Sequence, residues 1–134
     1  MSTVRTPSVE PLFEALSDAR RRYVMSLLLS RPQVSVEELC DEVVAWERTG
    51  AEGAVVRESV ITISLVHNHL PKLDDLGLVD YDVETGRVAR ADVDLETQRI
   101  VERAIELDES VPVAPASPVG SAYRPESSLA LDDE

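Results

Sequence analysis

Apolar positions recur at helical spacing between residues 59 and 76. Four apolar residues would form one buried stripe: Ile63, Val66, Leu70 and Leu73. The opposite face would carry Val60, Ser64, His67, Asn68, Pro71 and Asp75, with Ile61 and Lys72 at its edge. Gly77 is placed to end this helix because glycine adopts positive φ without a side-chain clash. Pro71 lies inside the predicted helix and is expected to kink it, at a cost of ~3 kcal/mol where nothing compensates.

A small β-hairpin is predicted to follow this helix, over about 78–91. Residues 78–81 favour a strand, residues 84–87 favour a turn, and Val88 and Ala89 begin a returning strand. A helix that leads into a small hairpin is the second half of a winged helix. The predicted fold class is therefore mainly α with a small β-hairpin wing (α+β), that is, a winged helix-turn-helix.

Two helices are predicted before this region, over 10–16 and 18–30. The first is expected to bury Leu12, Phe13 and Leu16. Ser17 is the expected N-cap of the second, because its hydroxyl can accept from an otherwise unpaired N–H. The expected buried side of the second helix comprises Tyr23, Val24, Leu27 and Leu28. This helix also contains the consecutive arginines 20–22, which fit two interpretations: contacts to phosphate, or a solvated face paired with acidic neighbours such as Glu14 and Asp18.

A third helix is predicted over 36–48, where it would be the first helix of the helix-turn-helix. Ser35 and Glu38 have the spacing of a capping box, in which Ser35 caps the helix and Glu38 reaches back to its backbone. The connection 49–58 is longer than the usual turn of three or four residues. Either the next helix begins early, near Val55, or a loop is inserted close to the expected binding face.

A last helix is predicted over 95–108, with Asp94 as its N-cap. Its apolar residues, among them Val101 and Ile105, would either form a dimer contact or pack on their own domain. The domain organisation that follows is a flexible arm at 1–9, a winged-helix domain at 10–92, this C-terminal helix within 93–109, and a tail at 110–134. The tail is acidic and contains several prolines, so it is expected to be disordered.

The chain is strongly acidic, with 26 Asp+Glu against 13 Lys+Arg and a formal net charge of −13 over 134 residues. Twelve of the basic residues are arginines and one is a lysine, Lys72. Acid excess with almost no lysine fits a cytoplasm rich in KCl, where repulsion between carboxylates is screened over only ~3 Å at molar salt. An ordinary acidic protein that avoids nucleic acid is the other interpretation. We expect a cytoplasmic protein, since the sequence shows neither a membrane span nor a signal peptide.

The helix and hairpin at 59–90 resemble the recognition helix and wing of ArsR-like transcriptional regulators. The matching residues are Val66, His69-Leu70, Leu73 and the run Leu76-Gly77-Leu78-Val79, followed by a Gly-Arg hairpin tip. The run His69 to Leu73 is similar to one in winged-helix domains common in halophilic archaea, which are often of unassigned function. The resemblance covers roughly residues 10–92. It implies a DNA-binding transcriptional regulator that acts as a homodimer on double-stranded DNA. The alternative is a winged helix retained as a protein–protein interaction module that does not bind DNA.

Candidate DNA-binding residues are those whose side chains offer hydrogen bonds on the recognition helix or the wing. On the helix they are Ser64, His67, Asn68 and Lys72, because base edges in the major groove are recognised by donors and acceptors. On the wing they are Arg87 and Arg90, which would contact the DNA backbone or minor groove. Asp74 and Asp75 would oppose phosphate from the C-terminal end of the helix.

Metal and enzyme chemistry find no support in the sequence. In metal-sensing ArsR relatives a Cys-x-Cys pair occupies the helix that corresponds to 36–48, but here Cys40 is followed two residues later by Glu42. One thiolate is too few for a soft metal, so Cys40 is expected to be a small buried hydrophobe. His69 is expected to be a packed core histidine. No phosphate loop, nucleophile motif or cofactor motif is present, so we expect neither an enzyme nor a cofactor.

Overall fold

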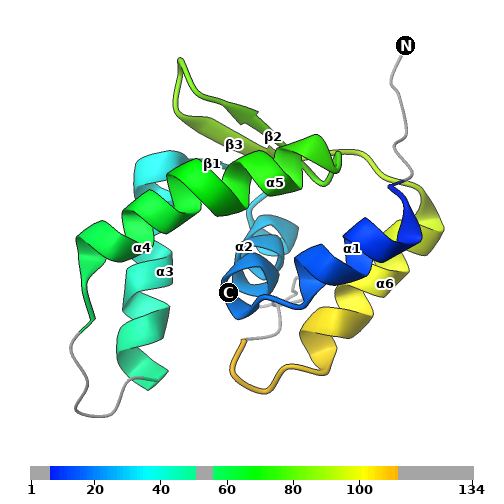
Figure 1. The fold of residues 1–134 in the computed structure, drawn as a ribbon, viewed down its shortest axis with the longest axis horizontal. Coiled ribbons are helices and arrows are strands. Elements are labelled where there is room, and N and C mark those ends of the chain that lie inside the picture. The colour runs from blue at the N-terminus through cyan, green and yellow to red at the C-terminus, as the bar shows by residue number, and fades with distance from the viewer. Residues whose placement is uncertain (1–6, 51–55, 112–134) are drawn as a thin grey trace, which may run out of the picture.

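A computed structural model of the chain describes residues 7–50 and 56–111 (Figure 1). Most of the predicted arm at 1–9, half of the 49–58 connection and almost all of the predicted tail at 110–134 lie outside the described residues. The elements run in the order α1 (Val9–Leu16), α2 (Ala19–Ser30), β1 (Gln33–Ser35), α3 (Val36–Gly50), α4 (Glu58–Ser64), the π-helix η1 (Leu65–His69), α5 (Leu70–Asp75), β2 (Val79–Asp82), β3 (Arg87–Arg90) and α6 (Leu95–Glu106).

These elements confirm the predicted mainly helical α+β class. The expected helices and the hairpin all form, with ends that differ from the prediction by a few residues. The unpredicted element is β1, which joins the hairpin to make an antiparallel sheet of order β1-β3-β2. Its register places Val34 opposite Val88, and Val88 opposite Tyr81. Three residues are too few to show the alternation that predicts a strand, so only the pairing partner defines β1.

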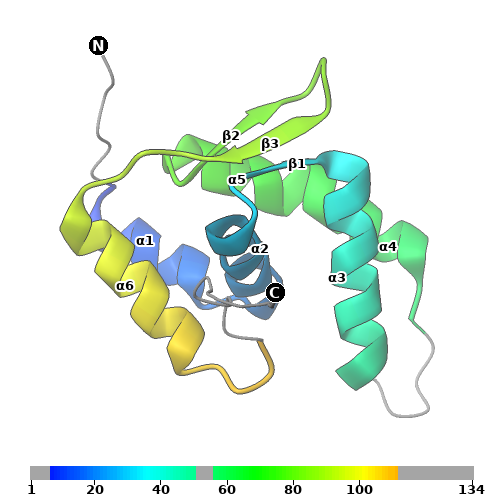
Figure 2. The same ribbon diagram turned by 180° about the vertical axis from the view of Figure 1, so that it is seen from behind.

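Helix α2 lies at the centre of the molecule, with α1 and α6 on one side and α3 on the other (Figures 1 and 2). The predicted buried side is confirmed, and Val24 and Leu28 are fully buried. Helix α6 packs along α2 and buries Val101 and Ile105, which are 3% and 2% exposed within the single chain. The expectation that these two residues form a dimer contact is therefore wrong, and the alternative, packing on their own domain, is correct.

Several predicted local contacts are replaced by others. The N-cap of α2 is Asp18 rather than Ser17, because its carboxylate accepts from the backbone N–H groups of Arg20 and Arg21. Ser35 does cap α3 by accepting from the N–H of Glu38 at 3.0 Å. The Glu38 carboxylate, however, pairs with Arg31 at 2.7 Å instead of reaching back to Ser35. Phe13, expected inside, is 55% exposed on α1.

Helix α4, η1 and α5 together form one helix from residue 58 to residue 75, called here the composite helix (Figure 1). It begins at Glu58 and not early, near Val55; α3 ends at Gly50, and residues 51–55 of the connection lie outside the described residues. Gly77 ends the composite helix as predicted: its φ is 79°, and the N–H of Leu78 bonds to the carbonyl of Leu73 at 3.0 Å.

The π-helical turn explains how the composite helix accommodates Pro71. A proline has no N–H, and in an α-helix its ring would clash with the carbonyl four residues earlier, here that of His67. Residues 65–69 widen into a π-helix immediately before it, with the N–H of Leu70 bonded to the carbonyl of Leu65. The irregularity expected at Pro71 is thus a local widening of the helix in the preceding turn.

Candidate nucleic-acid interface

The composite helix presents one side to the core and the other to solvent. Ile61, Leu65 and Leu73 are at most 2% exposed and face the core. The opposite side, called here the outer face, consists of Val60, Ile63, His67 and Asn68, all of which are exposed. The prediction placed Val60, His67 and Asn68 correctly. It placed Ile63 in the buried stripe, whereas Ile63 is 58% exposed.

The wrong register of the stripe has a physical reason. The prediction assumed 3.6 residues per turn, which groups Ile63, Val66, Leu70 and Leu73. Leu70 and Leu73 are buried as predicted, but before them the buried apolar positions are Ile61 and Leu65 rather than Ile63 and Val66. This shift is expected where a π-helical turn carries more residues than an α-helical one. Pro71 was the signal in the sequence that could have indicated the irregularity.

Ser64 does not belong to the outer face. It is half-buried, and its hydroxyl oxygen accepts a hydrogen bond from Arg20 Nη1 at 3.1 Å. Arg20 also makes a two-pronged ion pair with Glu47 of α3, one arm of which measures 3.0 Å between Nη2 and Oε1. This network joins α2, α3 and α4. The prediction that Ser64 is an exposed recognition residue is therefore wrong.

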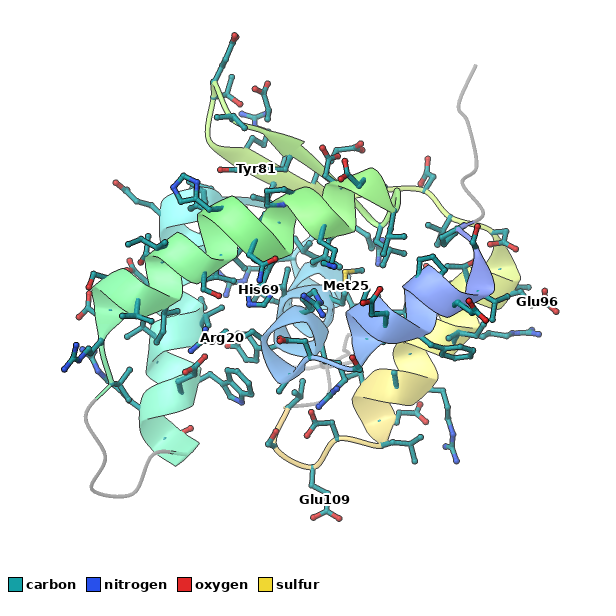
Figure 3. The ribbon with its side chains drawn as sticks, viewed as in Figure 1. Arg20, Met25, His69, Tyr81, Glu96 and Glu109 are labelled. Carbon is teal, nitrogen blue, oxygen red and sulfur yellow. The ribbon has the colours of Figure 1, made fainter. Side chains whose placement is uncertain are left out.

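The other two arginines of the run at 20–22 are also engaged inside the molecule. Arg21 is buried and donates to the carbonyl of Ala15 at 2.7 Å and to His69 Nδ1 at 3.1 Å. Arg22 pairs with Asp108 at 2.7 Å. The interpretation of arginines paired with acidic residues is therefore correct in part: Arg20 and Arg22 pair with Glu47 and Asp108, inside the molecule rather than on a solvated face. Figure 3 shows Arg20 between α2 and α3, and His69 where the composite helix crosses α2.

His69 is the packed core histidine that the sequence indicated, with 4% of its surface exposed. Burial is the main cause that lowers its pKa, and the nearby Arg21 and Arg20 lower it further. Asp18 and Glu47 act in the opposite direction. The neutral imidazole thus accepts from a buried guanidinium and links the composite helix to α2.

Charged residues lie at both ends of the composite helix, and Glu58 at its N-terminal end pairs with Arg48 at 2.8 Å. Lys72 is half-buried on the same side as Asn68, four residues earlier. Asp74 is half-buried and Asp75 is exposed, in the last turn, as the sequence suggested. Between residues 59 and 73 the sequence contains no acidic residue at all. The outer face is therefore free of carboxylates along its length.

The two wing arginines lie on opposite faces of the sheet, because side chains alternate along a strand and residues 87 and 90 differ by an odd number. Arg90 is half-buried on the side of Val88. Arg87 is exposed, and in the amide orientation that hydrogen bonding favours, its guanidinium donates to the oxygen of Gln33 on β1 at 2.7 and 2.9 Å. Only Arg87 is therefore placed on the outer surface of the wing.

A shallow groove lies between the end of α5 and the wing, on the surface that carries Arg87. It is lined by Asp74, Asp80, Tyr81, Asp82, Val83, Glu84, Arg87 and Ala89. Four of these eight residues are acidic and one is basic. Asp82 also shapes the hairpin turn, since its carboxylate accepts from the N–H groups of Glu84 and Thr85. The wing side of the surface is thus more acidic than the outer face.

Cys40 is buried, as predicted, and burial raises the pKa of its thiol. Among the described residues, no three His, Cys, Asp or Glu side chains come together as a metal ion would require. In the same part of the chain, no helix has the length and apolar character needed to span a membrane.

Comparison with known proteins identifies a family. A family described as a domain of unknown function, DUF7344, matches residues 13–89, which extend from α1 to β3. No curated protein and no solved structure matches the chain.

Proposed function

The chain belongs to the DUF7344 family of unknown function, and we propose that it is a winged helix-turn-helix transcriptional regulator that binds double-stranded DNA as a homodimer. The element order supports a winged helix, since α3 and the composite helix form consecutive helices followed by the β2–β3 wing. In such a fold the second of these helices enters the major groove.

The observation that carries the proposal is the outer face. In a chain with 26 Asp+Glu, residues 59–73 contain none, and the single lysine, Lys72, lies in this stretch. Any protein surface that meets the phosphate backbone must avoid carboxylates or neutralise them. Asn68 adds an amide that can pair bidentately with adenine, and His67 adds a second polar group.

Transcriptional control follows from sequence-specific binding. Homodimerisation is supported by the exposed Val9 and Phe13 on α1, which lie four residues apart on one side of that helix.

The test is fluorescence anisotropy with a duplex selected from random sequences and a scrambled version of it, from moderate to molar KCl. Asn68→Ala should lose preference for the selected duplex by ~1–3 kcal/mol, because it removes a base contact. Lys72→Ala should weaken both duplexes alike, because a phosphate contact positions without specifying. Arg99→Ala is the matched control: it removes one positive charge from an exposed site on α6, away from the composite helix (Figure 2).

A protein–protein module is the second candidate, and the acidic groove beside the wing favours it. Asp74, Asp82 and Glu84 would attract a basic segment of a partner and repel DNA. If no duplex binds at any KCl concentration, DNA binding is refuted and this candidate replaces it. If wild type binds but Asn68→Ala and Lys72→Ala match it on both duplexes, the assignment of the outer face as the recognition surface is wrong.

A further inference from the structure

Two branched apolar side chains stand on the outer face. Val60 is 51% exposed and Ile63 is 58% exposed, and a separation of three residues places them on the same side of α4. They adjoin His67 and Asn68 along that face. Other large apolar residues that are exposed lie elsewhere, on α1, on the hairpin turn and at the ends of α6.

An apolar pair next to an amide matches one kind of base pair in the major groove. An A·T pair presents the 5-methyl group of thymine, which is apolar, beside the N6 donor and N7 acceptor of adenine. A G·C pair presents no methyl group. The lack of carboxylates on the outer face lets this surface approach a polyanion, which the acidic groove beside the wing opposes.

We infer that Val60 and Ile63 are specificity-determining residues that contact thymine 5-methyl groups in an A·T-rich major groove. This inference rests on the DNA binding proposed above. Asn68 pairs with adenine in the same core. From Val60 to Asn68 the helix rises about 12 Å at 1.5 Å per residue, which corresponds to about four base pairs at 3.4 Å each. The recognised core is therefore A·T-rich over about four base pairs.

The experiment replaces thymine by deoxyuridine in the core of the selected duplex, which removes the methyl groups and keeps every hydrogen-bonding group. Wild-type affinity, measured by anisotropy at one fixed KCl concentration, should fall about fourfold for each methyl group that is buried in the complex. The Val60→Ala/Ile63→Ala variant should bind the thymine duplex more weakly than wild type does. Its affinity should no longer change when deoxyuridine is substituted.

Both substitutions are at exposed helical positions where alanine is a better helix former, so the variant is expected to fold. Leu107→Ala is the matched control, since Leu107 is 68% exposed at the far end of α6. This control should keep the full wild-type response to deoxyuridine.

The outcomes separate the two proposals. A selected core rich in G·C, an unchanged wild-type affinity for the deoxyuridine duplex, or a double variant as sensitive to deoxyuridine as wild type would overturn the role of Val60 and Ile63, while DNA binding itself stands. Failure of every duplex at every KCl concentration would refute DNA binding, and this inference with it.

Discussion

Acidification should destabilise the fold through one buried histidine, His69. This side chain is 4% exposed and accepts at Nδ1 from Arg21 at 3.1 Å. Burial, with Arg21 and Arg20 nearby, lowers the pKa of His69 in the folded protein. The unfolded chain has no such environment, so it protonates the imidazole at its ordinary value of about 6.5.

The direction of the pH effect on the free energy of unfolding depends on whether the folded or the unfolded state binds the proton more readily. Below pH 6.5 the unfolded chain binds more protons than the folded protein, so the free energy of unfolding decreases as the pH falls. The contribution of His69 is fully present above pH 6.5 and is lost as the pH falls toward the lowered pKa of the folded state. Between pH 7.5 and pH 5.5 the loss is at most about 1.4 kcal/mol, since one pKa unit corresponds to that energy.

The assay compares wild type with His69→Asn, whose amide oxygen can still accept from Arg21 but does not titrate. Urea unfolding is followed at fixed KCl by the fluorescence of the single tryptophan, Trp46, which stacks on Tyr23 with ring centroids 4.7 Å apart. The stability difference between the two proteins should shrink by up to about 1.4 kcal/mol from pH 7.5 to pH 5.5.

Carboxylates titrate in both proteins, so their effects cancel in this comparison. His67→Asn removes an exposed imidazole two residues earlier and should unfold within about 0.5 kcal/mol of wild type at pH 7.5. Parallel stability curves for wild type and His69→Asn across the whole pH range would refute the buried neutral imidazole.

Val101→Glu should destabilise the single domain by about 4 kcal/mol in urea unfolding, because it places a carboxylate at a site 3% exposed against α2; a stable monomer would contradict this. Phe13→Glu should convert a dimer to a folded monomer in light scattering at high KCl, whereas Val83→Glu, at a site 73% exposed on the hairpin turn, should not; a wild type that is already monomeric would refute the dimer. Asp108→Ala should shift the emission of Trp46 to the red, because it removes the anchor of the segment whose Ser110 carbonyl accepts from the indole N–H at 2.6 Å. DNA affinity should depend only weakly on KCl, or increase with it, because cations taken up between carboxylates and phosphate offset those released from DNA; a steep decrease would contradict this.

The order of helices and the hairpin could be predicted because their signals are local. Leu12 and Leu16, and the buried side of α2, follow helical spacing without interruption. Gly77 marks the end of the composite helix through a conformation that glycine adopts easily. The β1 strand could not be predicted, since it exists through pairing with β3, more than fifty residues later in the sequence.

The candidate site was predicted less well, because contacts between helices decide which of its side chains are exposed and which are buried. Ser64 has the polarity of a recognition residue, yet it accepts from Arg20, whose long side chain extends from α2 to α4. Ile63 has the polarity of a core residue, yet across the π-helical turn the buried stripe continues through Leu65 and Ile61, which leaves Ile63 exposed. Only the three-dimensional packing separates these two cases.

The arginine contacts also bear on how DNA would be bound. Arg20, Arg21 and Arg22 hold α2 to α3, to the composite helix and to the segment after α6, so their charges serve internal contacts. Few cations then remain on this surface to neutralise phosphate, and Lys72 is the only one between residues 59 and 73. Affinity would have to come mainly from base edges and apolar contacts on the outer face, which salt screening leaves intact. A protein that binds with few phosphate contacts should depend only weakly on KCl, and it must lose a large share of its affinity when Val60 and Ile63 are shortened, because their contacts to thymine methyl groups then supply much of the binding free energy.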